Sequence, residues 1–260
     1  MGYERELAAA REAARRATEL AMGYWRRGVE AEDKPDDSPV TVADKESEKL
    51  IMKLLKEEFP DDGFLGEEGS TEAGTSGRRW IIDPIDGTRD FVRGNRLWSN
   101  LLGLEAGGVV VAGVATFPAL GEQYWAVRGE GAWKYADGVA SRMRCSAITE
   151  TKRAVVCFNQ LNRVLAHPGP EKVLPFLAQF GASRCLGGAW DAMLVSEGCA
   201  EVWLEPVLKP WDLAALSVIA KEAGCAYFDY KGEDTIYGGN GVICVPAMVP
   251  VMRAFLGLSS

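Results

Sequence analysis

Apolar residues recur every three or four positions in two stretches near the start of the chain, and this spacing predicts two amphipathic helices. The first stretch runs over residues 7–25 and is expected to end near Gly28. A polar loop is expected over residues 33–39, where Asp and Pro are frequent. The second helix follows Thr41 and stops near Pro60, because proline does not continue a helix.

The middle of the chain has short apolar runs bounded by turn residues, which is typical of strands. Glycines at positions 107 and 108 separate the two longest runs and predict a hairpin. The strands predicted in this region cover residues 80–82, 97–105, 109–117, 124–127 and 132–135. We expect them to form an antiparallel sheet, since the connections between them are short.

From about residue 145 onward, strand and helix patterns alternate, which indicates α/β layering. Strands are predicted over 154–158, 201–204, 225–228 and 241–245, and helices over 173–179, 189–196, 213–222 and 248–255. The change of pattern predicts two parts: an α+β subdomain over residues 1–142, with an antiparallel sheet, and an α/β subdomain over residues 143–260.

Composition and charge narrow the class of protein. The 260 residues are 47% hydrophobic and 25% charged, which excludes disorder, collagen and coiled coil as global descriptions. The 29 Lys and Arg against 37 Asp and Glu give a net charge of −8, so neither nucleic acid nor an anionic membrane is an expected partner. The first 20 residues lack the apolar segment of a signal peptide, and no apolar run is long enough to span a bilayer.

Cysteine and histidine usage argues against a soft-metal site. The six cysteines include no CxxC pair and mostly lie among apolar residues, so we expect reduced thiols in a reducing, cytoplasmic compartment. The one histidine, His167, lies in Ala166-His167-Pro168-Gly169-Pro170 and is expected in a loop. A zinc site built on imidazole is therefore disfavoured.

The most informative segment is Trp80-Ile81-Ile82-Asp83-Pro84-Ile85-Asp86-Gly87-Thr88. A buried strand ends here in two carboxylates three residues apart, and Pro84 restrains the backbone between them. Gly87 permits close approach of the backbone to a ligand, and Thr88 is expected to cap a helix that begins near Arg89. Cation ligands beside a helix N-terminus that favours anions are what a metal-dependent phosphatase needs. A strand end with a solvated turn is the alternative.

Three further acidic residues occupy comparable positions. Glu67 follows a small apolar stretch in Phe64–Gly69, and Asp44 lies early in the second predicted helix. Asp212 lies at the start of another predicted helix. Taken singly, Glu67 and Asp44 are typical of a solvated surface, and Asp212 is typical of a helix cap.

Taken together, these residues resemble the inositol monophosphatase family of magnesium-dependent phosphomonoesterases. The resemblance covers nearly the whole chain, through Ser38-Pro39-Val40-Thr41, Gly66-Glu67-Glu68, Asp83-Pro84-Ile85-Asp86-Gly87-Thr88 and Trp211-Asp212. A DPxDGT segment followed by a WD pair is highly specific. The resemblance implies the layered α/β/α/β/α sandwich of sugar phosphatases.

The same resemblance implies a site for two or three Mg²⁺ ions, held by hard oxygen donors. The ligands would be the carboxylates of Glu67, Asp83, Asp86 and Asp212 and the backbone carbonyl of Ile85. A metal-activated water would attack phosphorus in line, with no covalent enzyme intermediate. Thr88, hydrogen-bonded to Asp44, would orient that water, and Glu67 would act with them in catalysis. Asp86 and the amides of Gly87 and Thr88 would contact the phosphate.

Within the family, the chain is most similar to the histidinol-phosphatase branch. Phe91-Val92-Arg93-Gly94, Pro118–Ala126 and Glu205-Pro206-Val207-Leu208 carry this weaker likeness. It implies hydrolysis of L-histidinol phosphate in histidine biosynthesis. The primary amine of that substrate favours a carboxylate partner. Glu205 is the candidate, because the family's substrate-contacting acid lies seven residues before the WD aspartate.

The chain departs from many histidinol phosphatases at Gly187-Gly188, where those enzymes have Gly-Asp. Asp191, on the next helical turn, is the candidate to replace the missing acid in contacting substrate. Arg184 is expected either to contact substrate or to hold Glu205 in place.

Other functions remain open. An inositol-1-phosphate or related polyol phosphatase would use the same metal chemistry without an amine for Glu205. A 3′-phosphoadenosine 5′-phosphate phosphatase would favour a basic rim, of which the net charge gives no sign. Some family members act as regulatory partners of RNA polymerase, but here the predicted metal ligands are all present. The family likeness also implies a homodimer, for which the hairpin region is a candidate surface.

Overall fold

The structure is a computed structural model, and it describes residues 2–34 and 39–259. Residues 35–38 belong to the predicted polar loop and include Ser38 of the first matching segment, so these parts of both predictions lie outside the described residues. Within the described ranges, no helix combines the length and hydrophobicity needed to cross a bilayer.

Helices α1 (Glu4–Arg27) and α2 (Val42–Glu58) form the predicted amphipathic pair and pack against each other. A ribbon of β1 (Glu32–Asp33) and β2 (Pro39–Val40) lies between them in the chain. A capping box starts α2: the Thr41 hydroxyl accepts from the Asp44 amide, and the Asp44 carboxylate accepts from the Thr41 amide at 2.8 Å. This box buries Asp44 in the first turn.

The first sheet has eight strands, in the order β10-β9-β8-β7-β6-β5-β3-β4. Their bounds are β3 (Gly63–Gly66), β4 (Thr71–Glu72), β5 (Arg78–Asp86), β6 (Ser99–Ala106), β7 (Val109–Phe117), β8 (Glu122–Val127), β9 (Gly131–Ala136) and β10 (Val139–Arg142). Only β3 and β5 pair in parallel among these neighbours. The predicted hairpin joins β6 to β7, whereas β3, β4 and β10 were not predicted.

The second sheet has five strands, in the order β12-β11-β13-β15-β14. Their bounds are β11 (Val155–Phe158), β12 (Ala182–Arg184), β13 (Val202–Glu205), β14 (Ala226–Phe228) and β15 (Gly241–Cys244). Strands β12, β11 and β13 run parallel, and the pairs of β15 with β13 and β14 are antiparallel.

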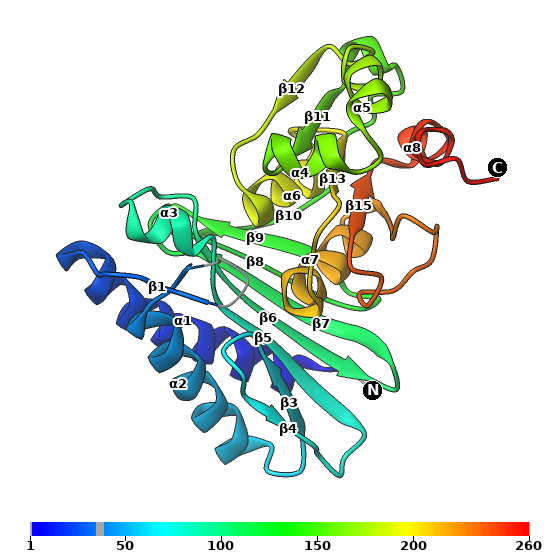
Figure 1. Ribbon diagram of the computed structural model, residues 1–260. Coiled ribbons are helices and arrows are strands. Elements are labelled where there is room, and N and C mark those ends of the chain that lie inside the picture. Colours follow the sequence, from blue (N-terminus) through cyan, green and yellow to red (C-terminus); the bar gives the residue numbers. More distant parts are fainter. Residues whose placement is uncertain (1, 35–38, 260) are drawn as a thin grey trace.

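Helices separate the sheets and cover their outer faces, as Figure 1 shows. Helices α1 and α2 cover one face of the large sheet, and α6 (Gly188–Ser196) and α7 (Pro210–Glu222) lie in the core between the sheets. Helices α4 (Leu161–Ala166), α5 (Pro170–Leu177) and α8 (Val249–Leu256) cover the far face of the small sheet. The short helix α3 (Thr88–Val92) follows β5, and 3₁₀ turns occur at Thr151–Arg153 and Pro246–Met248. The predicted α/β/α/β/α sandwich is confirmed.

Helix α7 packs closely on the large sheet because two glycines face it. A Cβ at Gly103 would lie 2.5 Å from the Ala214 Cβ, and a Cβ at Gly113 would lie 2.6 Å from Val218 Cγ1. Contacts that short do not occur between real side chains, so the helix would have to move away from any larger residue. The glycines on β6 and β7 therefore fix the depth at which α7 is seated.

The two sheets share one core. Strand β10 ends at Arg142 and β11 begins at Val155, so each predicted part holds one sheet. Ile81 and Leu101 from the first part nevertheless belong to the same buried cluster as Trp203 from the second. The division into subdomains at residue 142 stays a prediction. His167 lies in a turn after α4, as predicted.

Candidate metal centre and substrate cleft

Two predicted metal ligands lie at a break in the pairing of β5. The register between β5 and β6 shifts between Asp83 and Asp86. The Asn100 side chain, on β6, donates from Nδ2 to the backbone oxygens of Asp83 at 3.2 Å and Pro84 at 3.1 Å. Asn100 thus holds the irregular segment in place. The sequence pattern did not reveal this role, because Asn100 lies inside a predicted core strand.

Asp212 joins these two aspartates from the start of α7. Its Oδ2 accepts a hydrogen bond of 2.6 Å from the Lys209 amide, so the side chain also caps the helix. One carboxylate oxygen from each of Asp83, Asp86 and Asp212 lies within 4.8 Å of the others. Asp83 Oδ1 is buried and has no hydrogen-bond partner among the described residues. Three converging carboxylates with an unsatisfied buried oxygen fit a bound cation.

The carboxylates of this cluster repel one another strongly. Burial, followed by repulsion from Asp86, raises the pKa of Asp212 to about 8. Burial raises the pKa of Asp86 to about 6, and the charge of Glu67 adds to that shift. Burial and the neighbouring carboxylates also raise the pKa of Asp83 well above its ordinary range. A divalent cation would offset this repulsion, and an all-oxygen donor set suits Mg²⁺.

Glu67 reaches the cluster through the parallel pairing of β3 with β5. Gly66 is opposite Ile82 in this register, and the Glu67 amide donates to the Ile82 carbonyl at 3.1 Å. Glu67 therefore follows β3 at the same edge of the sheet where Asp83 continues β5. Its Oε1 lies 2.8 Å from Lys34 Nζ, and it is not one of the three clustered carboxylates.

A buried glutamate that the sequence did not single out supports the turn after Glu67. The Glu48 side chain, on α2, accepts hydrogen bonds from the amides of Glu68 at 2.9 Å and Ser70 at 3.1 Å. A Cβ at Gly66 would lie 2.4 Å from this carboxylate. Gly66 is thus required for the close approach of Glu48, which is a positioning residue for Glu67.

Thr88 and Asp44 meet as predicted. Thr88 Oγ1 lies 3.2 Å from both Asp44 Oδ1 and the Ile85 carbonyl oxygen. Burial raises the pKa of Asp44 to about 6, and hydrogen bonds from Thr41 oppose that shift. The prediction that Thr88 caps the next helix is wrong: Gly87, at a φ of 84°, occupies the N-cap position of α3, and the Thr88 hydroxyl interacts with Asp44 instead.

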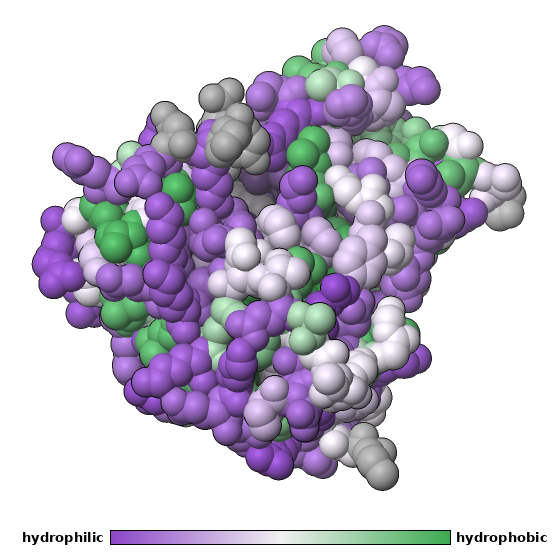
Figure 2. Space-filling view, turned by 60° about the horizontal axis from the view of Figure 1, so that its bottom comes forward, coloured by the Kyte–Doolittle hydropathy of each residue, from purple (hydrophilic) through white to green (hydrophobic). Residues whose placement is uncertain are grey.

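A cleft of about 450 Å³ opens beside the cluster. Glu67, Asp86 and Asp212 line it, together with Gly87, Thr88 and Glu205. The face of the molecule in Figure 2 is mostly hydrophilic, with hydrophobic residues in small separate patches. The lining groups suit a small, charged ligand.

Glu205 ends β13 and is only 2% exposed. Its Oε1 accepts a hydrogen bond of 3.2 Å from Asn159 Nδ2, whereas Oε2 has no partner within the described part of the chain. Burial, followed by repulsion from Asp212 and Asp86, raises the Glu205 pKa well above its ordinary range, and the charge of Arg163 opposes this. A buried carboxylate oxygen without a partner is suited to a cationic group of a ligand.

The structure places Asp191 and Arg184 away from the cleft lining. Asp191 is fully buried, and its Oδ2 accepts hydrogen bonds from the amides of Leu186-Gly187 at 3.0 and 3.1 Å. It shapes the turn before α6 and does not replace the missing acid in this geometry. Arg184 is exposed on β12 and donates to the neighbouring backbone carbonyl, so Asn159, and not Arg184, contacts Glu205.

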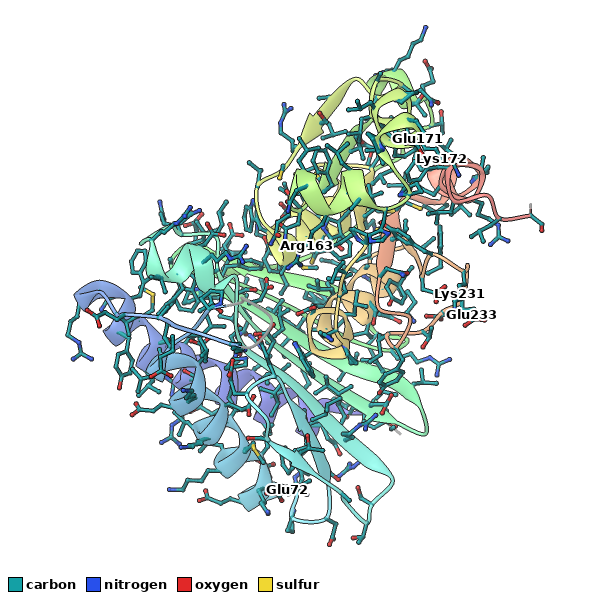
Figure 3. The ribbon with its side chains drawn as sticks, viewed as in Figure 1. Glu72, Arg163, Glu171, Lys172, Lys231 and Glu233 are labelled. Carbon is teal, nitrogen blue, oxygen red and sulfur yellow. The ribbon has the colours of Figure 1, made fainter. Side chains whose placement is uncertain are left out.

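The cleft has a basic rim that the net charge did not reveal. Arg89, Arg93 and Arg163 are among its lining residues. Figure 3 shows Arg163 extending from α4 toward the larger sheet. Net charge averages over the whole surface, so an acidic chain can carry a local cluster of cations.

Known proteins resemble this chain in sequence and in fold. A histidinol-phosphatase of Chlorobaculum parvum is 41% identical over 239 residues, covering 92% of this chain and 91% of that protein. A histidinol-phosphatase of Mycobacterium tuberculosis is 36% identical, covering 87% and 88%. The crystal structure of the extragenic suppressor protein suhB of Bartonella henselae superposes with a TM-score of 0.89 at 27% identity, covering 97% and 98%. The model of the inositol monophosphatase family matches residues 3–254, and the chain belongs to that family.

Proposed function

We propose that this protein is a Mg²⁺-dependent phosphomonoesterase that hydrolyses L-histidinol phosphate to L-histidinol and inorganic phosphate in histidine biosynthesis. Its likeness to two histidinol-phosphatases, at 41% and 36% identity, supports the phosphatase chemistry and this branch. The observation that carries the choice of substrate is Glu205, which lines the same cleft as the metal-ligand cluster and has a buried carboxylate oxygen without a hydrogen-bond partner among the described residues.

The metal would be held by the clustered carboxylates of Asp83, Asp86 and Asp212, with Glu67 and the Ile85 carbonyl as further ligands. Bound there, Mg²⁺ supplies a Lewis acid for the phosphoryl oxygens and lowers the proton affinity of the nucleophilic water. The protein contributes the fixed geometry. Asn100 holds the backbone between two of the ligands, and the N-terminus of α7 presents the third.

Thr88 and Asp44 would orient the attacking water and accept its proton. Thr88 Oγ1 accepts a hydrogen bond from that water and donates its own hydrogen to Asp44 Oδ1, 3.2 Å away. Asp44 has a pKa of about 6, because it is buried, and a carboxylate of that pKa is a useful proton acceptor near neutral pH. The backbone amides of Gly87 and Thr88 are assigned to the phosphate, in a cleft that both residues line.

Glu205 would receive the substrate's primary ammonium group at Oε2. The pairing satisfies a buried oxygen that has no other partner among the described residues. It also lowers the cost of keeping Glu205 ionised away from water. Discrimination against an ester without an amine follows, because such a substrate would leave this oxygen unpaired.

A second candidate is a phosphatase for esters that carry another anionic group, such as 3′-phosphoadenosine 5′-phosphate. The three arginines at the cleft favour it. Inositol-1-phosphate, the other alternative, has neither an amine for Glu205 nor a second anion for the rim.

Phosphate release tests the proposal directly. The purified protein would be assayed with Mg²⁺ on L-histidinol phosphate, inositol-1-phosphate, fructose-1,6-bisphosphate and 3′-phosphoadenosine 5′-phosphate, with EDTA as the control. We expect kcat/KM for L-histidinol phosphate to exceed the rest by at least tenfold, or about 1.4 kcal/mol. Preference for the adenosine bisphosphate would favour the second candidate, and full activity in EDTA would contradict the metal assignment.

We also propose a cytoplasmic homodimer. The six cysteines are unpaired, which suits a reducing compartment. Tyr135 on β9 and Val139 on β10 are exposed at the edge of the large sheet, at 42% and 64%. Light scattering after size-exclusion chromatography would distinguish a dimer from a monomer, and a Val139→Lys variant would test this edge.

A further inference from the structure

The pairing of β11 with β13 brings an unassigned carboxamide to the cleft. Phe158 is opposite Leu204 in this parallel register, so the residues that follow them in the chain, Asn159 and Glu205, lie side by side. Both residues line the cleft. The contact is direct, since Asn159 Nδ2 donates to Glu205 Oε1 at 3.2 Å. The register of two core strands therefore sets the orientation of the Glu205 carboxylate.

The contact leaves one acceptor free on each partner. Glu205 Oε2 has no hydrogen-bond partner among the described residues, and the contact with Glu205 uses the carboxamide nitrogen of Asn159 and not its oxygen. A carboxamide that donates from its nitrogen still has an oxygen that accepts. The pair thus offers two acceptors, one of them charged, to a ligand that brings several N–H donors.

Gly188 keeps a space open between this pair and the metal ligands. A Cβ at Gly188 would lie 3.5 Å from Asn159 Nδ2, 3.8 Å from Asp86 Oδ1 and 3.8 Å from Glu205 Oε2. These are ordinary contact distances, so nothing in the backbone requires glycine there. Any longer side chain would occupy the position where the three polar groups face one another, and that space is available to substrate.

The chain turns sharply just after Asn159. Gln160 has a φ of 49°, in the left-handed region that residues other than glycine rarely adopt. It occupies the N-cap position of α4 and lines the cleft. A strained residue at this point is consistent with a segment shaped for ligand contact, because such strain concentrates at binding sites.

We infer that Asn159 is a specificity-determining residue: its nitrogen holds Glu205 in one orientation, and its oxygen accepts a second N–H from the protonated primary amine of the substrate. The inference rests on the proposed function, since it assigns the amine to this end of the cleft. The Asn159 carboxamide oxygen is a neutral acceptor beside the charged Glu205 Oε2, in the space that Gly188 leaves open.

The test compares two esters that differ by one group. L-Histidinol phosphate carries the amine, and 3-(imidazol-4-yl)propyl phosphate lacks only that amine. Asn159→Ala should lower kcat/KM for the first ester at least tenfold, mainly through KM, and change it less than threefold for the second. Asn162→Ala, which removes a carboxamide from the same cleft lining without touching Glu205, should leave the ratio of the two esters unchanged.

Two further variants separate recognition from folding. Asn159→Asp keeps the shape but replaces the N–H donor with a carboxylate beside Glu205, so it should not restore the wild-type ratio. The Glu205→Gln and Asn159→Ala changes should be strongly non-additive when combined, because both act on the same amine.

The outcomes are distinct. Equal losses on both esters in Asn159→Ala, with a wild-type enzyme that prefers the amine, would overturn the role of Asn159 and leave the proposed function intact. A wild-type enzyme that treats the two esters alike would overturn amine recognition by both Asn159 and Glu205, whereas the comparison of L-histidinol phosphate with the three unrelated esters decides the proposed function. A lowered Tm with an unchanged ratio of the two esters would show that Asn159 is structural only.

Discussion

The carboxylate cluster and the Asn159–Glu205 pair belong to one cleft, but the chain builds them by different means. Asp83 and Asp86 lie three residues apart on one strand, and Asp212 is fixed by the first turn of one helix. Asn159 and Glu205 are 46 residues apart and meet only because two strands of the small sheet pair in a particular register.

The difference separates chemistry from recognition. The cluster depends on local backbone features, namely the register break in β5 and the start of α7. These features tolerate few substitutions. The recognition pair depends on which side chains follow two short strands, so its polarity can change while the strands stay the same. Substrate preference can therefore change while the metal-ligand cluster stays the same.

The largest effect should come from the cluster. Asp86→Asn or Asp212→Asn removes one charge from the metal site, and we expect phosphate release to fall about 10³-fold or more, equal to about 4 kcal/mol. Asp61→Asn, which makes the same chemical change at an exposed residue outside the cluster, serves as the control. Turnover within threefold of wild type at saturating Mg²⁺ would remove the residue from the metal site.

Thr88 tests the proton path beside the cluster. Thr88→Val keeps the shape but removes the hydroxyl that interacts with Asp44 Oδ1, and kcat should fall about 10²-fold, the lower end for acid–base assistance. Thr88→Ser restores the hydroxyl and should recover most of the loss. A serine variant as slow as the valine variant would argue against the hydroxyl as the active group.

The recognition pair should show a smaller, selective effect. Glu205→Gln keeps a hydrogen-bonding group but removes the charge, so kcat/KM for L-histidinol phosphate should fall about 10- to 100-fold, as expected for hydrogen bonds to charged groups. Inositol-1-phosphate turnover should change less than about threefold by the same reasoning. The test measures kcat/KM of the wild type and of Glu205→Gln on both substrates. Equal losses on the two substrates would show that Glu205 does not recognise the amine.

The smallest expected effect is the pH dependence of the stabilisation of the fold by Mg²⁺. The pKa of Asp212 is raised to about 8 in the fold, because burial and Asp86 disfavour its charge. Its contribution to the stability of the metal-free protein therefore falls as pH rises from about 4 to about 8. Mg²⁺ binds the ionised carboxylates, so the stabilisation by Mg²⁺ should be larger at pH 8 than at pH 5.5.

Thermal unfolding in Mg²⁺ and in EDTA at the two pH values measures this effect. At about 100 times Kd the stabilisation is about 2.7 kcal/mol, which corresponds to roughly 5–10 °C in Tm for a chain of this size. A larger Mg²⁺ effect at pH 5.5 would contradict the sign of the Asp212 shift.

The sequence predicted the layered fold and the cluster because their signals are local. Helical spacing identified α1 and α2, and the DPxDGT segment and WD pair carried three carboxylates at recognisable positions. Strands β3, β4, β10 and β12 were not predicted, because none of them has more than two apolar residues in a row, whereas the equally short β11, β13, β14 and β15 each have three or more.

The recognition pair and the supporting residues could not be predicted in the same way. Asn159 follows a predicted core strand, and nothing local marks it as a neighbour of Glu205. Asn100 and Glu48 act on backbone groups far away in sequence, so only the tertiary structure shows their role. Asp191 is only three residues from Gly188, but its Oδ2 accepts hydrogen bonds from the turn before α6, and the residue does not line the cleft.

Gly103 and Gly113 lie on the large sheet beneath α7, and they set how near its helix axis can come to the strands. That distance also sets how far Asp212 lies from Asp83 and Asp86, because Asp212 belongs to the first turn of α7. A methyl group added at either glycine would displace a metal ligand without altering one. Variants with weakened metal affinity should therefore arise in this interior, and selection for tighter or looser metal binding has a target there that lies outside the set of metal ligands.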